Sequence, residues 1–251
     1  MNRDHWRVQQ KVDAAWQAVV SGMQTMYPAS VIRPAQLAEA FELDRTAEDD
    51  QVKFNIKPIV LNVPERATRQ DANLYVAIAG WLSFEGPDFQ ASPMKTKTFG
   101  TQVAYFRSKV GALEHVYGAH YDIDEGAPGH PVFHAQVSPK ADMVTSVNER
   151  FGKSYQNVVN LVDGMLGNVR TPSAQMDVFA FMLQICADHL IHSKSPPNVI
   201  EAFNKMCVAC EFFLGAAYRN PSLNQAPASL CYRAMHWYAR AEGQQQASGT
   251  T

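Results

Sequence analysis

The period of the hydrophobic pattern changes twice along the chain. Residues 4–26 carry apolar side chains at three- and four-residue steps, which is typical of an amphipathic helix. A shorter helix is predicted over 34–42, with a proline at its first position. From about residue 52 the period becomes two, and after Pro139 it returns to that of a helix. The pattern therefore predicts helices, then a sheet, then helices again.

Five segments in the middle of the chain are predicted to be strands of one sheet. The segment 73–85 is apolar on both faces, which indicates a central strand that is covered on both sides. Pro58 predicts an edge position or a bulge in the first strand. Because the connections are too short for parallel crossovers, the sheet should be an antiparallel meander. The strands are expected at 53–63, 73–85, 98–108, 112–124 and 131–138.

The second half of the chain is predicted to be helical. Thr171 followed by Pro172 indicates an N-cap and a first helical position, and the helix that they begin should run to about residue 191. The other helices are expected at 142–152, 155–165, 198–218 and 228–243.

These elements predict an α+β fold. An antiparallel five-stranded meander sheet is flanked by an N-terminal helix and a C-terminal bundle of three or more helices. We expect a single domain over 1–251, in which 1–139 holds the first helices and the sheet and 140–243 forms a helical subdomain. The acidic stretch 42–50 should be a solvated connector, and 244–251 a flexible tail.

Composition places the chain among ordinary globular proteins. Of 251 residues, 46% are hydrophobic and 18% charged, and the formal net charge is -2. This balance argues against nucleic acid as the main partner, because such surfaces are usually basic. No apolar run reaches the roughly 18 residues that span a bilayer, and the N-terminus lacks the apolar segment of a signal peptide. A cytoplasmic protein without a membrane partner is therefore expected.

The four cysteines fit the same compartment. Cys186, Cys207, Cys210 and Cys231 lie in helix-like segments with apolar neighbours, where reduced cysteines behave as small core residues. The two-residue spacing between Cys207 and Cys210 is also used by zinc sites and redox pairs. A redox pair normally opens a helix after a strand, whereas this pair lies inside a helical pattern. The sequence favours packing.

Common nucleotide and hydrolase motifs are missing. Residues 152–154 are Gly-Lys-Ser, but a phosphate-binding loop needs a glycine at position 147, where the chain has Val147. The sequence contains neither a G-x-G-x-x-G nor a G-x-S-x-G stretch. The chain therefore lacks the usual sequence motifs of dinucleotide-binding folds and of α/β-hydrolases.

Polar residues gather in the stretch HYDIDEGAPGHPVFHAQ, at 120–136. Alternate residues of a strand share a face, so His120 and Asp122 should point to the same side of the sheet. A hairpin centred near Ala127 would place His120 directly across from His134, with β-carbons about 4.5–5.5 Å apart. The sequence thus predicts that two imidazoles and one carboxylate meet on one face.

Two histidines and one carboxylate with open positions form the ligand set of non-haem iron oxygenases and of some zinc or manganese hydrolases. The cofactors that His120, Asp122 and His134 could hold are therefore Zn, Mn or Fe. The His-x-Asp spacing of 120–122 resembles the first part of the iron oxygenase triad. Because His134 follows after only fourteen residues, the resemblance covers three residues and assigns no family.

Two further residues belong to the candidate site. Gln136 shares a strand face with His134. Arg170 stands just before the expected helix start, where backbone donors and its own charge could hold an anion or a carboxylate. The simpler explanation for Arg170 is a pair with a nearby acidic side chain.

The cluster also has simpler explanations. Histidine and aspartate commonly lie on the solvated face of a hairpin, and metal-free acid–base use of His120 or His134 is a third alternative. If a metal does bind, the imidazoles must be neutral, so binding should weaken below about pH 6.

Two classes of function remain open. The first is an accessory or assembly protein, which would contact a second copy or another subunit through its C-terminal helices. The absence of a strong catalytic signature favours this class. The second is a metal-dependent hydrolase or oxygenase that uses His120, Asp122 and His134. The sequence does not decide whether the protein is an enzyme.

Overall fold

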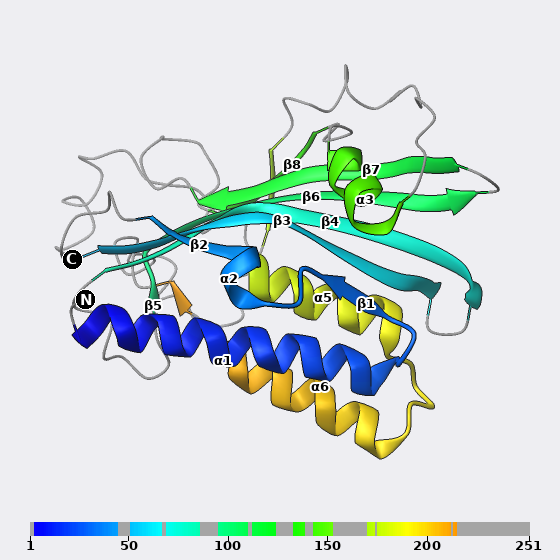
Figure 1. The fold of residues 1–251 in the computed structure, drawn as a ribbon, viewed down its shortest axis with the longest axis horizontal. Coiled ribbons are helices and arrows are strands. Elements are labelled where there is room, and N and C mark those ends of the chain that lie inside the picture. The colour runs from blue at the N-terminus through cyan, green and yellow to red at the C-terminus, as the bar shows by residue number, and fades with distance from the viewer. Residues whose placement is uncertain are drawn as a thin grey trace, which may run out of the picture.

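The fold is α+β, with helices on both faces of a large antiparallel sheet (Figure 1). It was obtained as a computed structural model. None of the helices described is long and apolar enough to cross a membrane. The structure describes residues 3–44, 51–66, 69–85, 95–109, 112–123, 133–138, 143–152, 170–173, 175–211 and 213–214.

Within the described residues, the sheet has eight strands in the order β1-β3-β4-β6-β7-β8-β9, with β2 pairing alongside β1 on β3. Its central strands correspond to the five predicted ones: β3 (Gln51–Arg66), β4 (Arg69–Glu85), β6 (Thr98–Lys109), β7 (Ala112–Ile123) and β8 (Phe133–Val137). Successive members of this group pair antiparallel, as predicted. Three short strands extend the sheet beyond the predicted count: β1 (Val31–Arg33), β2 (Phe41–Asp44) and β9 (Arg170–Pro172).

Two details of the central strands follow the sequence pattern. The pairing of β3 with β4 shifts between Ile56 and Ile59, and Pro58, which has no backbone N–H, lies in this bulge. Strand β4 is central and buried on both faces, since Val76 belongs to one hydrophobic core and Tyr75 to the other.

The larger core lies between the sheet and α1 (Arg3–Met26), α5 (Val178–Leu190) and α6 (Pro197–Ala209), which gather on one side in Figure 1. The ring of Phe41 lies 5.4 Å from that of Trp16 and is stacked at 5.6 Å on Phe179. Where α1 crosses α6, a β-carbon at Gly22 would overlap the side chain of Met206, so only glycine fits without rearrangement.

The opposite face is partly covered by α3 (Val144–Phe151), which contacts β3 and β4. Val144 and Val147 pack into the smaller core there, and the ring of Phe151 lies 5.1 Å from that of Tyr75. The helix ends at Gly152, whose φ of 62° is the left-handed conformation that glycine adopts readily. The helix predicted at 142–152 is therefore confirmed.

The predictions for residues 34–50 were partly wrong. Helix α2 (Leu37–Ala40) is only four residues long, and Phe41–Asp44 forms β2 instead of continuing the helix or beginning a solvated connector. The reason lies in pairing, because Phe41 faces Ile56 and Leu43 faces Phe54 across the ladder with β3. Residues 45–50 lie outside the described part of the chain.

Two helix boundaries also differ. Thr171 and Pro172 do not begin a helix but lie in β9, and α5 begins at Val178 with Asp177 as its N-cap. Proline is tolerated in β9 because this strand is at the edge of the sheet. Helix α6 ends at Ala209, and β10 (Phe213–Leu214) pairs in parallel with β5 (Lys95–Thr96), so the helix expected over 198–218 is too long. The expected helices at 155–165 and 228–243, the tail 244–251 and Cys231 lie outside the described residues.

Candidate functional site

All five candidate residues lie at neighbouring positions of three adjacent strands. His120 and Asp122 are on β7, His134 and Gln136 on β8, and Arg170 on β9. The predicted pairing is wrong by two residues, because His134 faces Asp122, and His120 faces Gln136. A shift of two keeps every side chain on its own face of the sheet, so the cluster forms with Asp122 in its centre.

The three metal-ligating side chains converge. Nε2 of His134 lies 2.8 Å from Oδ1 of Asp122, and Nε2 of His120 lies 3.9 Å from Oδ2. One ligand atom from each residue can be chosen so that all three lie within 4.8 Å of one another. The His134 side chain is only 3% exposed, whereas those of Asp122 and His120 are 30% and 28% exposed. The cluster is therefore buried on one side and open to solvent on the other.

The contact between His134 and Asp122 is not an ordinary hydrogen bond. Oδ1 of Asp122 is buried and accepts no hydrogen bond from any described residue, although Nε2 of His134 lies 2.8 Å away. Nε2 of His134 and Oδ1 of Asp122 are therefore close together without the geometry of a hydrogen bond. Two neighbouring ligands of one ion are also close together, because metal–ligand distances near 2.1 Å place them about 3.0–3.4 Å apart.

The third ligand needs only a small movement. In a tetrahedral site, or on one face of an octahedral one, ligand atoms lie about 3.0–3.4 Å apart at such metal distances. The 3.9 Å between Nε2 of His120 and Oδ2 of Asp122 is longer than this, so the part-exposed His120 ring must move closer to share an ion with the other two ligands. The residues present fit a divalent ion held by two imidazoles and one carboxylate.

The remaining two candidates flank this cluster. Arg170 pairs with Gln136 through the backbone, so the ladder places Arg170, Gln136 and His120 in one row across three strands. The expected reason for Arg170 was wrong, because Arg170 is the first residue of strand β9 and does not precede a helix start.

The site also contains residues that were not predicted from the sequence. The row that holds Asp122 and His134 continues to Gly100 on β6 and Trp81 on β4. A glycine inside a strand often marks the close approach of another group. Gly100 within its predicted strand was therefore a signal that a bulky side chain, here that of Trp81, lies against the backbone. A hollow of about 280 Å³ lies here, lined by Trp81, Gly100, Thr101, Gln102, His120, Tyr121 and Asp122.

The described cysteines do not form a comparable site. Cys186, Cys207 and Cys210 are free thiols, and burial raises the pKa of Cys186 and of Cys210 to about 12. Thiols with such pKa values supply little thiolate, which is the form that attacks or binds metal. Sγ of Cys210 lies 3.8 Å from the backbone carbonyl of Ala15 on α1. This contact and its burial support a packing role for Cys210.

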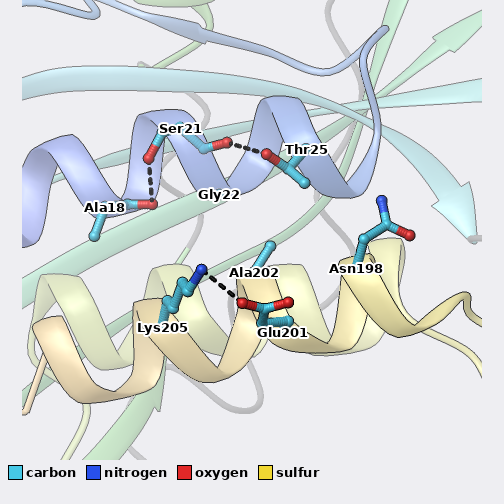
Figure 2. Close-up of a pocket in the computed structure, with 8 residues that line it drawn as sticks. All are labelled: Ala18, Ser21, Gly22, Thr25, Asn198, Glu201, Ala202 and Lys205. Carbon is cyan, nitrogen blue, oxygen red and sulfur yellow. Dashed lines mark hydrogen bonds and ion pairs between the residues drawn. The ribbon is translucent and has the colours of Figure 1, made fainter.

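A second hollow, of about 440 Å³, lies between α1 and α6 (Figure 2). Several of its polar groups interact within their own helices. Lys205 pairs with Glu201 at 2.7 Å, and the Thr25 hydroxyl donates to the carbonyl of Ser21. Figure 2 shows that these groups do not converge on one point. The lining residues are Ala18, Ser21, Gly22, Thr25, Asn198, Glu201, Ala202 and Lys205.

Comparison with known proteins adds no assignment, since no protein family, curated protein or solved structure matches the chain. Among the described residues, His120, Asp122 and His134 are the group arranged to hold a metal ion.

Proposed function

We propose that the protein is a metal-dependent enzyme whose divalent ion is held by His120, Asp122 and His134. The observation that carries this proposal is the convergence of three ligand atoms within 4.8 Å. The chemistry of the donors agrees, because two imidazoles and one carboxylate suit Zn, Mn and Fe.

The partial exposure of the cluster supports catalysis over a purely structural ion. Structural zinc sites are closed by four protein ligands, whereas catalytic sites keep a position open for water or substrate. Three protein ligands beside an open hollow meet the second description. A Zn or Mn ion would activate water for hydrolysis, and an Fe ion would favour oxygenase chemistry.

Elemental analysis of the purified protein tests the metal. We expect near-stoichiometric Zn, Mn or Fe, and its identity would separate hydrolase from oxygenase. Replacing both His120 and His134 by alanine should abolish metal binding, because one carboxylate remains. Replacing the exposed His192, which lies outside the cluster, should leave the metal content unchanged. A negligible metal content in the unaltered protein after loading with each of the three ions would refute the proposal.

For the compartment we propose the cytosol. The three described cysteines are free, and free thiols are typical of reducing compartments.

A second candidate function is assembly with a further copy of the chain. Helix α6 exposes apolar side chains, since Val208 is 71% and Ile200 37% exposed. Exposed apolar surface is a feature of interaction sites. Light scattering should then show a dimer or larger species, and Val208→Asp should shift it toward monomer. A monomer at all concentrations would leave only the enzyme proposal.

A further inference from the structure

Trp81 lies flat on the sheet beside the metal ligands. A β-carbon at Gly100 would collide with three adjacent atoms of the indole six-membered ring, Cη2, Cζ3 and Cζ2, which lie nearly equally close to that position. Such near-equal proximity means that the face of the ring, and not its edge, covers Gly100. The other face of the ring is therefore turned away from the sheet.

The ladder places this ring next to the proposed ion. Trp81, Gly100 and Asp122 occupy one row on three neighbouring strands. Adjacent strands are about 4.8 Å apart, so a ring that lies over β6 is one strand away from Asp122. Trp81, His120 and Asp122 line the same hollow of about 280 Å³, and Gln102 adds a neutral amide to it.

We propose that Trp81 is the binding platform for the substrate of this site, and that the substrate is a small molecule with a planar unsaturated ring bearing an oxygen-donor group. The ring stacks on the outer face of Trp81, and the oxygen donor reaches the metal. This inference rests on the proposed metal site.

The shape and chemistry of the hollow support this class of ligand. An indole face attracts another ring in an offset stack, and such aromatic pairs contribute beyond their buried area. Polar side chains also reach the hollow, namely Gln102 on the neighbouring row and the ligands His120 and Asp122. A volume of about 280 Å³ is at the lower end of small-molecule sites, which favours a single ring over a polymer.

A matched pair of chelators tests the platform. Benzohydroxamate and acetohydroxamate bind a metal through the same two oxygens and differ in the ring. On the Zn-loaded protein, we expect benzohydroxamate to bind about threefold to tenfold more tightly than acetohydroxamate, as stacking predicts. Trp81→Ala should abolish this preference, and Trp81→Phe should restore most of it, because phenylalanine also offers a ring face. Titration calorimetry gives both affinities.

The controls separate the two proposals. The zinc content of each variant is measured first, and Trp6→Ala, at a 50% exposed residue on α1, should retain the preference. Full zinc content with equal affinity for both chelators in the unaltered protein would overturn the platform and leave the metal site standing. The same holds if the preference survives in Trp81→Ala. Failure of the unaltered protein to bind Zn, Mn or Fe after loading with each ion would overturn both proposals together.

Discussion

Asp177 shows how burial and hydrogen bonding compete at a single residue. Its carboxylate caps α5 by accepting hydrogen bonds from the N–H groups of Phe179 and Ala180, and it also accepts one from Gln175. These bonds favour the charged form, but the side chain is fully buried. Burial has the larger effect and raises the pKa of Asp177 to about 6, from an ordinary value of 3.8.

This shift predicts a pH-dependent stability. The folded chain holds the Asp177 proton more tightly than the unfolded chain, so the stabilisation is complete below about pH 4 and is lost as the pH rises to about 6. The total is about 3 kcal/mol, at about 1.4 kcal/mol per pH unit. Asp177→Asn keeps a capping oxygen and does not titrate. In urea unfolding, wild-type stability relative to this variant should therefore fall by about 2.4 kcal/mol from pH 4 to pH 7, because the unfolded carboxyl is already partly ionised at pH 4.

The exposed Glu201 supplies the control for this measurement. Glu201→Gln removes a carboxylate from the surface of α6, so the wild type compared with this variant should show a much smaller change over the same pH range. The prediction would be wrong if the stability difference between the wild type and Asp177→Asn did not change with pH. The buried carboxyl would then bind its proton equally tightly in the folded and unfolded chains.

The cluster around Asp122 shows which features the residue pattern can predict and which it cannot. Alternation correctly assigned His120, Asp122 and His134 to one face, because a slip of one residue would have mixed apolar and polar faces. A slip of two residues leaves both faces intact, so the pattern cannot distinguish it. The central place of Asp122 could be found only from the three-dimensional pairing.

At the scale of elements, strong periodicity predicted the long segments. Helix α1 and the five long strands lie within a few residues of their expected positions. Their apolar residues repeat at a regular spacing, which makes the pattern recognisable in the sequence. The central position of β4 followed from its apolar character on both faces.

The short elements depend on contacts from distant parts of the chain. Strand β2 exists because residues 41–44 pair with β3, and β9 because residues 170–172 pair with β8. Their own sequences are three or four residues long and carry helix-like signals, such as Thr171-Pro172. The apolar run after Asp177 also predicted a helix. The capping contacts of Asp177 show that the helix begins there and not at Thr171-Pro172.

At the scale of the whole molecule, the two faces of the sheet differ in how much apolar surface they bury. The face under α1, α5 and α6 holds the larger core, with Trp16, Phe54 and Phe179 buried. The other face holds the smaller core near α3 and, farther along the strands, the candidate site. Polar ligands can therefore gather on one face, because most of the apolar burial lies on the other.

This arrangement predicts that metal binding stabilises the whole fold. An ion on His120, Asp122 and His134 would join β7 to β8 inside the sheet. A ligand that binds only the folded state adds about 2.7 kcal/mol when its free concentration is 100 times its Kd. For a chain of 251 residues this corresponds to a rise in Tm of about 5–10 °C.

Thermal unfolding followed by circular dichroism, with and without the metal, measures this rise. His134→Ala should lose it, since the variant keeps only two ligands, whereas Trp81→Ala should keep it, since Trp81 is not a ligand. If the metal bound stoichiometrically and the Tm did not move, the β7–β8 pair would have to open before the rest of the sheet unfolds. Strand β7 pairs along its length with β6, so we expect a single transition in which the ion at the sheet face stabilises the helices on the opposite face as well.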